Sequence, residues 1–187
     1  MLVAKLPFLP GNMLPQGPVN NTLRATAMKP TFIFGDPDSE RAKLLQQGFA
    51  SHPQITACLL KPHELRALPN LDAFYLSIMA AERWGSFTPP PAIHEARVLK
   101  TTPKDQADGW PPFVIAGVAL REGEDLFDTK RGLALIVRAV IEAVTKFNAH
   151  EHEAIQNIGF ESYFTGIEKL APLDAAQIIC AVYDEVK

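Results

Sequence analysis

The chain has 187 residues, of which 47% are hydrophobic and 21% are charged, as is usual for one globular domain. Its net charge is -3 at pH 7 and it has no run of lysines and arginines, which argues against nucleic-acid binding. No apolar run approaches the roughly 20 residues of a membrane span, and Pro7 and Pro10 interrupt the N-terminal apolar segment, which makes it a poor secretory signal. Cys58 and Cys180 lie in apolar segments, where thiols usually pack as small hydrophobes. We therefore expect a cytoplasmic protein that binds neither nucleic acid nor membranes.

The first 30 residues are rich in proline, glycine and asparagine and show neither helical nor strand periodicity. We interpret residues 1–30 as an irregular arm before a domain over residues 31–187. Met28 precedes the first clear strand, so an over-extended gene start remains an alternative.

From residue 31 onward, short apolar segments alternate with segments of helical periodicity. In chain order, we expect a strand at 31–34, a helix capped by Asp36 or Asp38 and ending near 51, a strand at 55–60, a helical turn at 62–68, a strand at 72–78, an irregular segment at 79–110, a strand at 113–120, a helix at 128–148, a strand at 157–163 and a helix at 173–186 with Pro172 at its start. This alternation predicts an α/β fold with a mostly parallel sheet and helices on both faces.

In such sheets, ligands bind beyond the carboxyl ends of the strands. Asp36 follows the first strand in an acidic turn, where its carboxylate could accept hydrogen bonds from adenine or ribose, hold Mg²⁺ or simply cap the helix. Ser77, Trp84 and Ser86 follow the third strand, and the indole of Trp84 could stack on a base or belong to an ordinary amphipathic loop.

A second group of candidate ligand-binding residues follows the last predicted strand. Backbone N–H groups in a turn before a helix can cradle a phosphate, although an ordinary turn has the same pattern. The residues are Ser162, Thr165, Gly166 and Ile167.

Sequence motifs for catalysis and metal binding are absent. The segment His150-Glu151-His152 has the spacing of a metal-ligand pair, but no third ligand is evident, and we predict no metal site and no cofactor. The sequence has no local Ser-His-Asp or Cys-His signature and no glycine-rich nucleotide motif, so we assign no catalytic residue.

The order of these segments from residue 31 to the C terminus resembles a macrodomain, specifically the divergent branch met in phage-associated and bacterial ADP-ribose-phosphate-processing-like proteins. The matching segments are TFIFGDPDSE, RAKLLQQGF, ITACLL, LPNLDAFYLSI, FVIAGVAL, RGLALIVRAVIEAVTKF, NIGFESYFTG and LDAAQIICAVYDEV. The resemblance implies a three-layer fold with a mixed, mostly parallel sheet, and a pocket that binds ADP-ribose or a related nucleotide. It leaves hydrolase activity open.

Three segments depart from the family pattern. Leu76–Ala81 replaces the asparagine- and glycine-containing first ligand loop, only Thr165-Gly166 remains of the glycine-rich phosphate loop, and Lys61-Pro62 occupies the place of a Gly-Asp pair that holds adenine. Bulky side chains prevent the close backbone approach that glycine permits.

These departures keep two alternatives open. One is a degenerate macrodomain that serves protein interaction or homo-oligomer formation without binding a nucleotide, in which Trp84, Tyr163 and Phe164 fill the cleft or line a dimer surface. The other is a degenerate phospho-receiver domain, in which Ser77 stands where the phospho-acceptor aspartate is needed. A mixed sheet of six or more strands would favour the macrodomain, and a five-stranded parallel sheet the receiver.

Overall fold

The computed structural model describes residues 29–87, 92, 94–118, 126–151, 153–161 and 169–186. Within these residues, six strands form one sheet in the order β2-β1-β6-β3-β5-β4. The strands are β1 (Thr31–Asp36), β2 (Ile55–Leu59), β3 (Ala73–Ser77), β4 (Ala96–Lys100), β5 (Phe113–Gly117) and β6 (Asn157–Glu161). All neighbouring strands are parallel except β4 and β5, which are antiparallel. The chain therefore has the α/β fold with a mixed, mostly parallel sheet that its sequence predicts.

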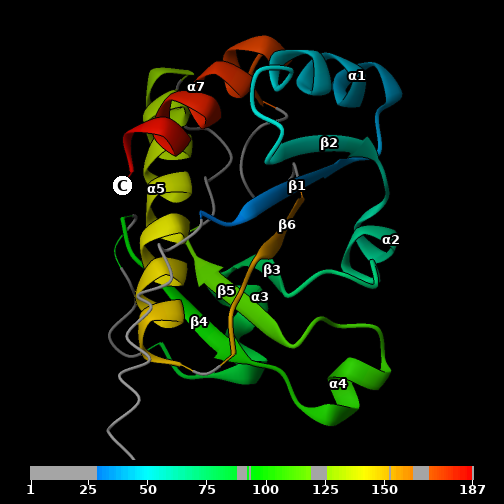
Figure 1. Cartoon of the computed structure of the whole chain (residues 1–187), viewed down its shortest axis with the longest axis vertical. Coiled ribbons are helices and arrows are strands. Elements are labelled where there is room, and N and C mark those ends of the chain that lie inside the picture. The colour runs from blue at the N-terminus through cyan, green and yellow to red at the C-terminus, as the bar shows by residue number, and fades with distance from the viewer. Residues whose placement is uncertain are drawn as a thin grey trace, which may run out of the picture.

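Helices cover both faces of this sheet (Figure 1). The long helix α5 (Leu126–His150), α1 (Ser39–Gly48) and α7 (Pro172–Glu185) pack over one face, and α5 and α7 lie against each other. The other face carries the short helices α2 (Pro62–Arg66) and α3 (Ile78–Ala81) and the 3-10 helix η1 (Glu82–Trp84). A further short helix, α4 (Pro103–Ala107), connects β4 to β5.

The larger core lies between the sheet and α1, α5 and α7, and aromatic rings form its centre. Phe160 stacks on Phe34 with ring centroids 4.9 Å apart and on Tyr75 at 5.6 Å, and it meets Phe32 edge-on at 4.9 Å. Each of these four residues is almost completely buried. Rings on three neighbouring strands thus hold β1, β6 and β3 together.

Local signals in the sequence explain where two helices begin. Asp38 is the N-cap of α1, and its carboxylate accepts hydrogen bonds from the backbone N–H groups of Glu40 and Arg41 at 2.9 Å. Pro172 occupies the first turn of α7, where a missing N–H costs little. Both features are as the sequence predicts.

The segment at 79–110 differs most from the prediction. It contains α3, η1, the edge strand β4 and α4, where an irregular stretch is expected. Because β4 pairs antiparallel with β5, the sheet is mixed and differs from the five-stranded parallel sheet expected of a receiver domain. Of the predicted N-terminal arm, only Lys29 and Pro30 are among the described residues. No helix in the described part of the chain is long and apolar enough to cross a bilayer.

Candidate functional site

The carboxyl edge of the parallel strands contains a reversal in strand order. From β1 the chain moves outward to β2, whereas β3 leads to β5 and β4 on the opposite side, with β6 between the two halves. Strands β6 and β3 are paired at Ala73–Ile158 and Phe74–Gly159, near their amino ends, and then continue to Glu161 and Ser77. Such a reversal is the usual place for a ligand in an open α/β sheet.

Asp36 stands at this edge, at the end of β1, and its side chain is fully buried. Its Oδ1 accepts a hydrogen bond from the backbone N–H of Asp38 at 2.8 Å, and its Oδ2 lies 2.9 Å from Nε of Arg41. The carboxylate therefore orders the β1–α1 turn and fixes Arg41 beside it. The guanidinium is partly open to solvent, with 26% of the Arg41 side chain exposed.

Ser77, at the end of β3, is the N-cap of α3. Its hydroxyl accepts a hydrogen bond from the backbone N–H of Ala80 at 3.3 Å. Met79, in the same short helix, is 84% exposed, and Leu59 at the end of β2 is 58% exposed. The carboxyl edge therefore carries exposed apolar side chains as well as polar ones.

Ser86 follows Gly85, which packs on the antiparallel edge strand β4. It is exposed and lines a cavity of about 350 Å³ with Glu82, Gly85 and Phe87. Gly85 packs so closely on Leu99 of β4 that a Cβ there would lie 3.0 Å from its Cδ2 atom. Of these two predicted ligand residues, Ser77 thus lies at the end of β3, and Ser86 follows a glycine that packs on β4.

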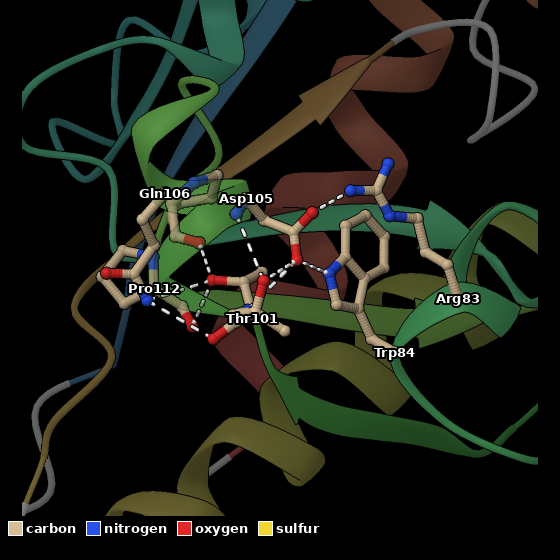
Figure 2. A network of polar contacts seen from close by, with 8 residues as sticks. Arg83, Trp84, Thr101, Asp105, Gln106 and Pro112 are labelled. Carbon is tan, nitrogen blue, oxygen red and sulfur yellow. Dashed lines mark hydrogen bonds and ion pairs between the residues drawn. The ribbon is translucent and has the colours of Figure 1, made fainter.

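Trp84 belongs to a network of polar contacts centred on Asp105 (Figure 2). The side chain of Asp105 is only 10% exposed. It accepts hydrogen bonds from Nε1 of Trp84 at 2.8 Å and from the Thr102 hydroxyl at 2.6 Å, and it pairs with the guanidinium of Arg83. Thr101 lies in the same network and donates from its hydroxyl to the carbonyl oxygen of Pro111 at 2.7 Å.

The ring of Trp84 is also covered. Its centroid lies 4.8 Å from that of Trp110, and the guanidinium of Arg83 stands 4.3 Å above it. Arg66 in turn lies over Trp110 at 4.5 Å. The ring predicted to stack on a base therefore has Trp110 and Arg83 as its neighbours in this structure.

The remaining predicted ligand residues follow β6. Ser162, Thr165, Gly166 and Ile167 lie outside the described residues, as do Tyr163 and Phe164, which were expected to fill the cleft in a degenerate domain.

A cavity of about 740 Å³ lies at the amino ends of β1 and β2, opposite the carboxyl ends where a ligand is expected. Its lining residues are Lys29, Ser51, His52, Pro53, Gln54, Tyr183 and Asp184. In it, the Ser51 hydroxyl lies 2.9 Å from Nδ1 of His52, and Nε2 of His52 lies 3.1 Å from Oδ2 of Asp184. The sequence did not predict this cluster, because Asp184 is 132 residues from His52 and a serine beside a histidine is no signature by itself.

Hydrogen bonds beside this cavity connect Lys29 and Pro30 to the last turn of α7. The Lys29 ammonium donates to the carbonyl oxygens of Tyr183 and Asp184, in the last turn of the helix, where carbonyls lack intrahelical partners. The Tyr183 hydroxyl donates to the carbonyl oxygen of Pro30 at 3.0 Å. Burial, followed by the nearby Asp184 carboxylate, raises the pKa of the Tyr183 hydroxyl.

Both cysteines are free. Burial raises the pKa of the Cys58 thiol, and burial together with Asp184 raises that of Cys180 to about 11. Among the described residues, no group of histidine, cysteine, aspartate and glutamate side chains has the arrangement of a metal site. The ring of His150 lies 2.7 Å from the carbonyl oxygen of Lys146, one turn earlier in α5.

The described part of the chain is thus an α/β protein with a six-stranded mixed sheet and helices packed on it. Comparison of the chain with protein-family models, with curated proteins and with solved structures found no match.

Proposed function

We propose that this protein is a macrodomain-like binding domain that takes ADP-ribose or a related nucleotide at the carboxyl edge of its sheet. The observation that carries the proposal is the reversal of strand order around β6, where β3 and β6 are paired near their amino ends and continue beyond. Open α/β sheets bind ligands at such a point. The mixed six-stranded sheet is also the one that the resemblance to macrodomains implies.

The polar groups at this edge suit a nucleotide in two ways. Asp36 fixes the guanidinium of Arg41 at the end of β1, and a partly exposed guanidinium is a good partner for a diphosphate. Glu161 ends β6 opposite Gly35, and a carboxylate there can accept hydrogen bonds from ribose hydroxyls or an adenine amino group. In this proposal, Asp36 positions Arg41 and does not itself contact adenine.

The two free cysteines fit a protein of a reducing compartment, and we propose the cytoplasm.

A second candidate function is protein association at the same edge, without a nucleotide. It is favoured by the exposed side chains of Met79 and Leu59, which follow β3 and end β2. Exposed apolar side chains at a surface lose contact with water when two proteins associate, which favours association. The occupant would be another protein or a second copy of this chain.

Calorimetric titration with ADP-ribose, with AMP and NAD for comparison, tests the nucleotide proposal. We expect micromolar binding that Ser77→Trp weakens at least tenfold, because the indole would occupy the space beyond β3. Gln177→Trp, on the exposed side of α7, is the matched control and should bind as the wild type does.

Absence of heat and of a thermal shift at millimolar ADP-ribose, with folded protein, would refute nucleotide binding. Association would then be tested by light scattering. A dimer that Met79→Glu dissociates would support the second candidate, and a monomer at every concentration would contradict homo-oligomer formation.

A further inference from the structure

We propose that Ser51, His52 and Asp184 form a serine-nucleophile site that cleaves small carboxylic esters in the cavity at the amino edge of the sheet. This site lies at the opposite end of the strands from the proposed nucleotide site and does not depend on it. Its three side chains are linked in series at 2.9 Å and 3.1 Å. A nucleophile, a base and a group that orients the base, each within hydrogen-bond reach of the next, define such a site by geometry.

The protonation of the imidazole follows from its two neighbours. The ionised Asp184 carboxylate can only accept, so Nε2 of His52 carries the proton and donates it to Oδ2. Nδ1 then presents its lone pair to the Ser51 hydroxyl 2.9 Å away. His52 is therefore held in the tautomer that can accept the serine proton, and Asp184 acts as a positioning residue.

The fold holds the three residues in place from two separate elements. The turn after α1 is fixed by a hydrogen bond from the His52 N–H to the carbonyl oxygen of Phe49 at 2.8 Å, and by one from the Ile55 N–H to the carbonyl oxygen of His52 at 2.9 Å. Asp184 lies in the last turn of α7. The His52 side chain is 17% exposed, so its ring is largely packed and restricted in orientation.

Close packing of α1 on α7 brings these elements together. A Cβ on Gly48, near the end of α1, would lie 2.4 Å from the Cβ of Ala176. Glycine is needed for this approach. The same approach places the turn after α1 beside the end of α7 and within reach of Asp184.

The cavity suits a small, neutral acyl group. Its volume of about 740 Å³ is within the range of small-molecule sites, roughly 300–1,000 Å³. Lys29 lines the same cavity. Its ammonium donates to the carbonyl oxygens of Tyr183 and Asp184, and its positive charge can also offset the negative charge developing on the carbonyl oxygen of an ester. The Asp184 carboxylate is 68% exposed and disfavours anionic substrates.

The reaction proceeds in two halves. Ser51 Oγ forms a bond to the acyl carbon while its proton passes to Nδ1 of His52, and the ester C–O bond then breaks as the alcohol leaves with that proton. In the second half, water gives a proton to Nδ1 and its oxygen bonds to the acyl carbon, and the acid leaves as Ser51 Oγ recovers the proton. Only the ester and water are consumed.

The first test is covalent labelling of the full chain with a fluorophosphonate, which phosphonylates activated serines with loss of fluoride. Mass spectrometry should place the label on Ser51, and Ser51→Ala should remove it. His52→Gln should slow labelling by about 100-fold, the range expected for loss of a general base. No label on Ser51 above that of denatured protein would overturn the proposal.

The second test is hydrolysis of 4-nitrophenyl acetate. Ser51→Ala must lower the rate at least tenfold, because an unchanged rate would mean that His52 or Lys29 alone reacts with the ester and would overturn the proposal. Asp184→Asn should lower the rate about tenfold. Glu185→Gln, which removes the neighbouring carboxylate that pairs with Arg138, should leave it unchanged. If Asp184→Asn and Glu185→Gln lower the melting temperature equally and neither changes the rate, Asp184 only stabilises α7 and the proposal is wrong.

Discussion

Replacement of Asp105 by alanine is the most informative perturbation on the face of the sheet that carries α2, α3 and η1. Its nearly buried carboxylate accepts hydrogen bonds from Trp84 Nε1 and from the hydroxyl and N–H of Thr102. Loss of the bond from Trp84 to a charged acceptor costs about 1.5–3 kcal/mol, and loss of the capping interactions with Thr102 costs about 1 kcal/mol. The pair with Arg83, whose side chain is 51% exposed, contributes less than about 1 kcal/mol. We therefore expect Asp105→Ala to lower the free energy of unfolding by about 3–4 kcal/mol.

Urea unfolding followed by intrinsic fluorescence measures this change directly. The chain has two tryptophans, Trp84 and Trp110, and their rings are in contact in this cluster. Asp108→Ala is the matched control, because Asp108 is exposed at the other end of α4, and it should cost less than about 0.5 kcal/mol. If Asp105→Ala costs no more than Asp108→Ala, the carboxylate does not hold Trp84 and the reasoning fails.

Two further predictions concern α1. The backbone N–H of Arg41 is the main cause that lowers the pKa of Asp38 below its ordinary 3.8. The folded pKa is thus below the unfolded one, and the cap stabilises the protein above pH 3.8 and ceases to do so as the pH falls through the lowered pKa. Asp38→Ala should therefore lower the melting temperature at pH 7, whereas a difference from wild type that persists undiminished at pH 2 would contradict this account. Gly48→Ala should cost about 1–3 kcal/mol through its clash with Ala176. Adding Ala176→Gly should restore part of that loss, and strictly additive costs in thermal denaturation would show that the two positions do not compete for space.

The Asp105 network and the Ser51 cluster differ in how open they are. Asp105 is enclosed by its donors and is explained by stability alone, whereas the Ser51 hydroxyl is on an exposed residue that lines a cavity. Buried polar groups are usually fully hydrogen-bonded for structural reasons. The hydrogen-bonded series from Asp184 through His52 ends at the exposed Ser51 hydroxyl, which a ligand in the cavity can reach.

Local patterns in the sequence were sufficient for most of the secondary structure. Continuous apolar segments predicted β1, β2, β3, β5 and β6. Strands β2, β3 and β5 end earlier than expected, and residues 162 and 163 of the last predicted strand lie outside the described residues. Helical periodicity predicted α1, α5 and α7, and the capping role of Asp38 and the position of Pro172 followed from their chemistry. These features depend on residues close together in the chain, and a single sequence therefore contains the information.

Strand β4 was not predicted because its residues are mixed in character. Arg97 and Lys100 stand among Ala96, Val98 and Leu99, and each of these five residues is only half-buried or exposed at the sheet edge. An edge strand needs no continuous apolar segment, and here neither face gives a clear alternation.

Tertiary structure alone decided which side chains meet. Trp84 reaches Asp105 and Trp110, and His52 reaches Asp184 across 132 residues, because the sheet order and the approach of α1 to α7 bring them together. Long-range pairing of this kind depends on the packing of whole elements, and no periodicity or spacing within the chain specifies it. The sequence by itself therefore determined the class of fold and the strand ends where a ligand was sought, whereas the folded chain revealed the serine cluster at the other end of the sheet.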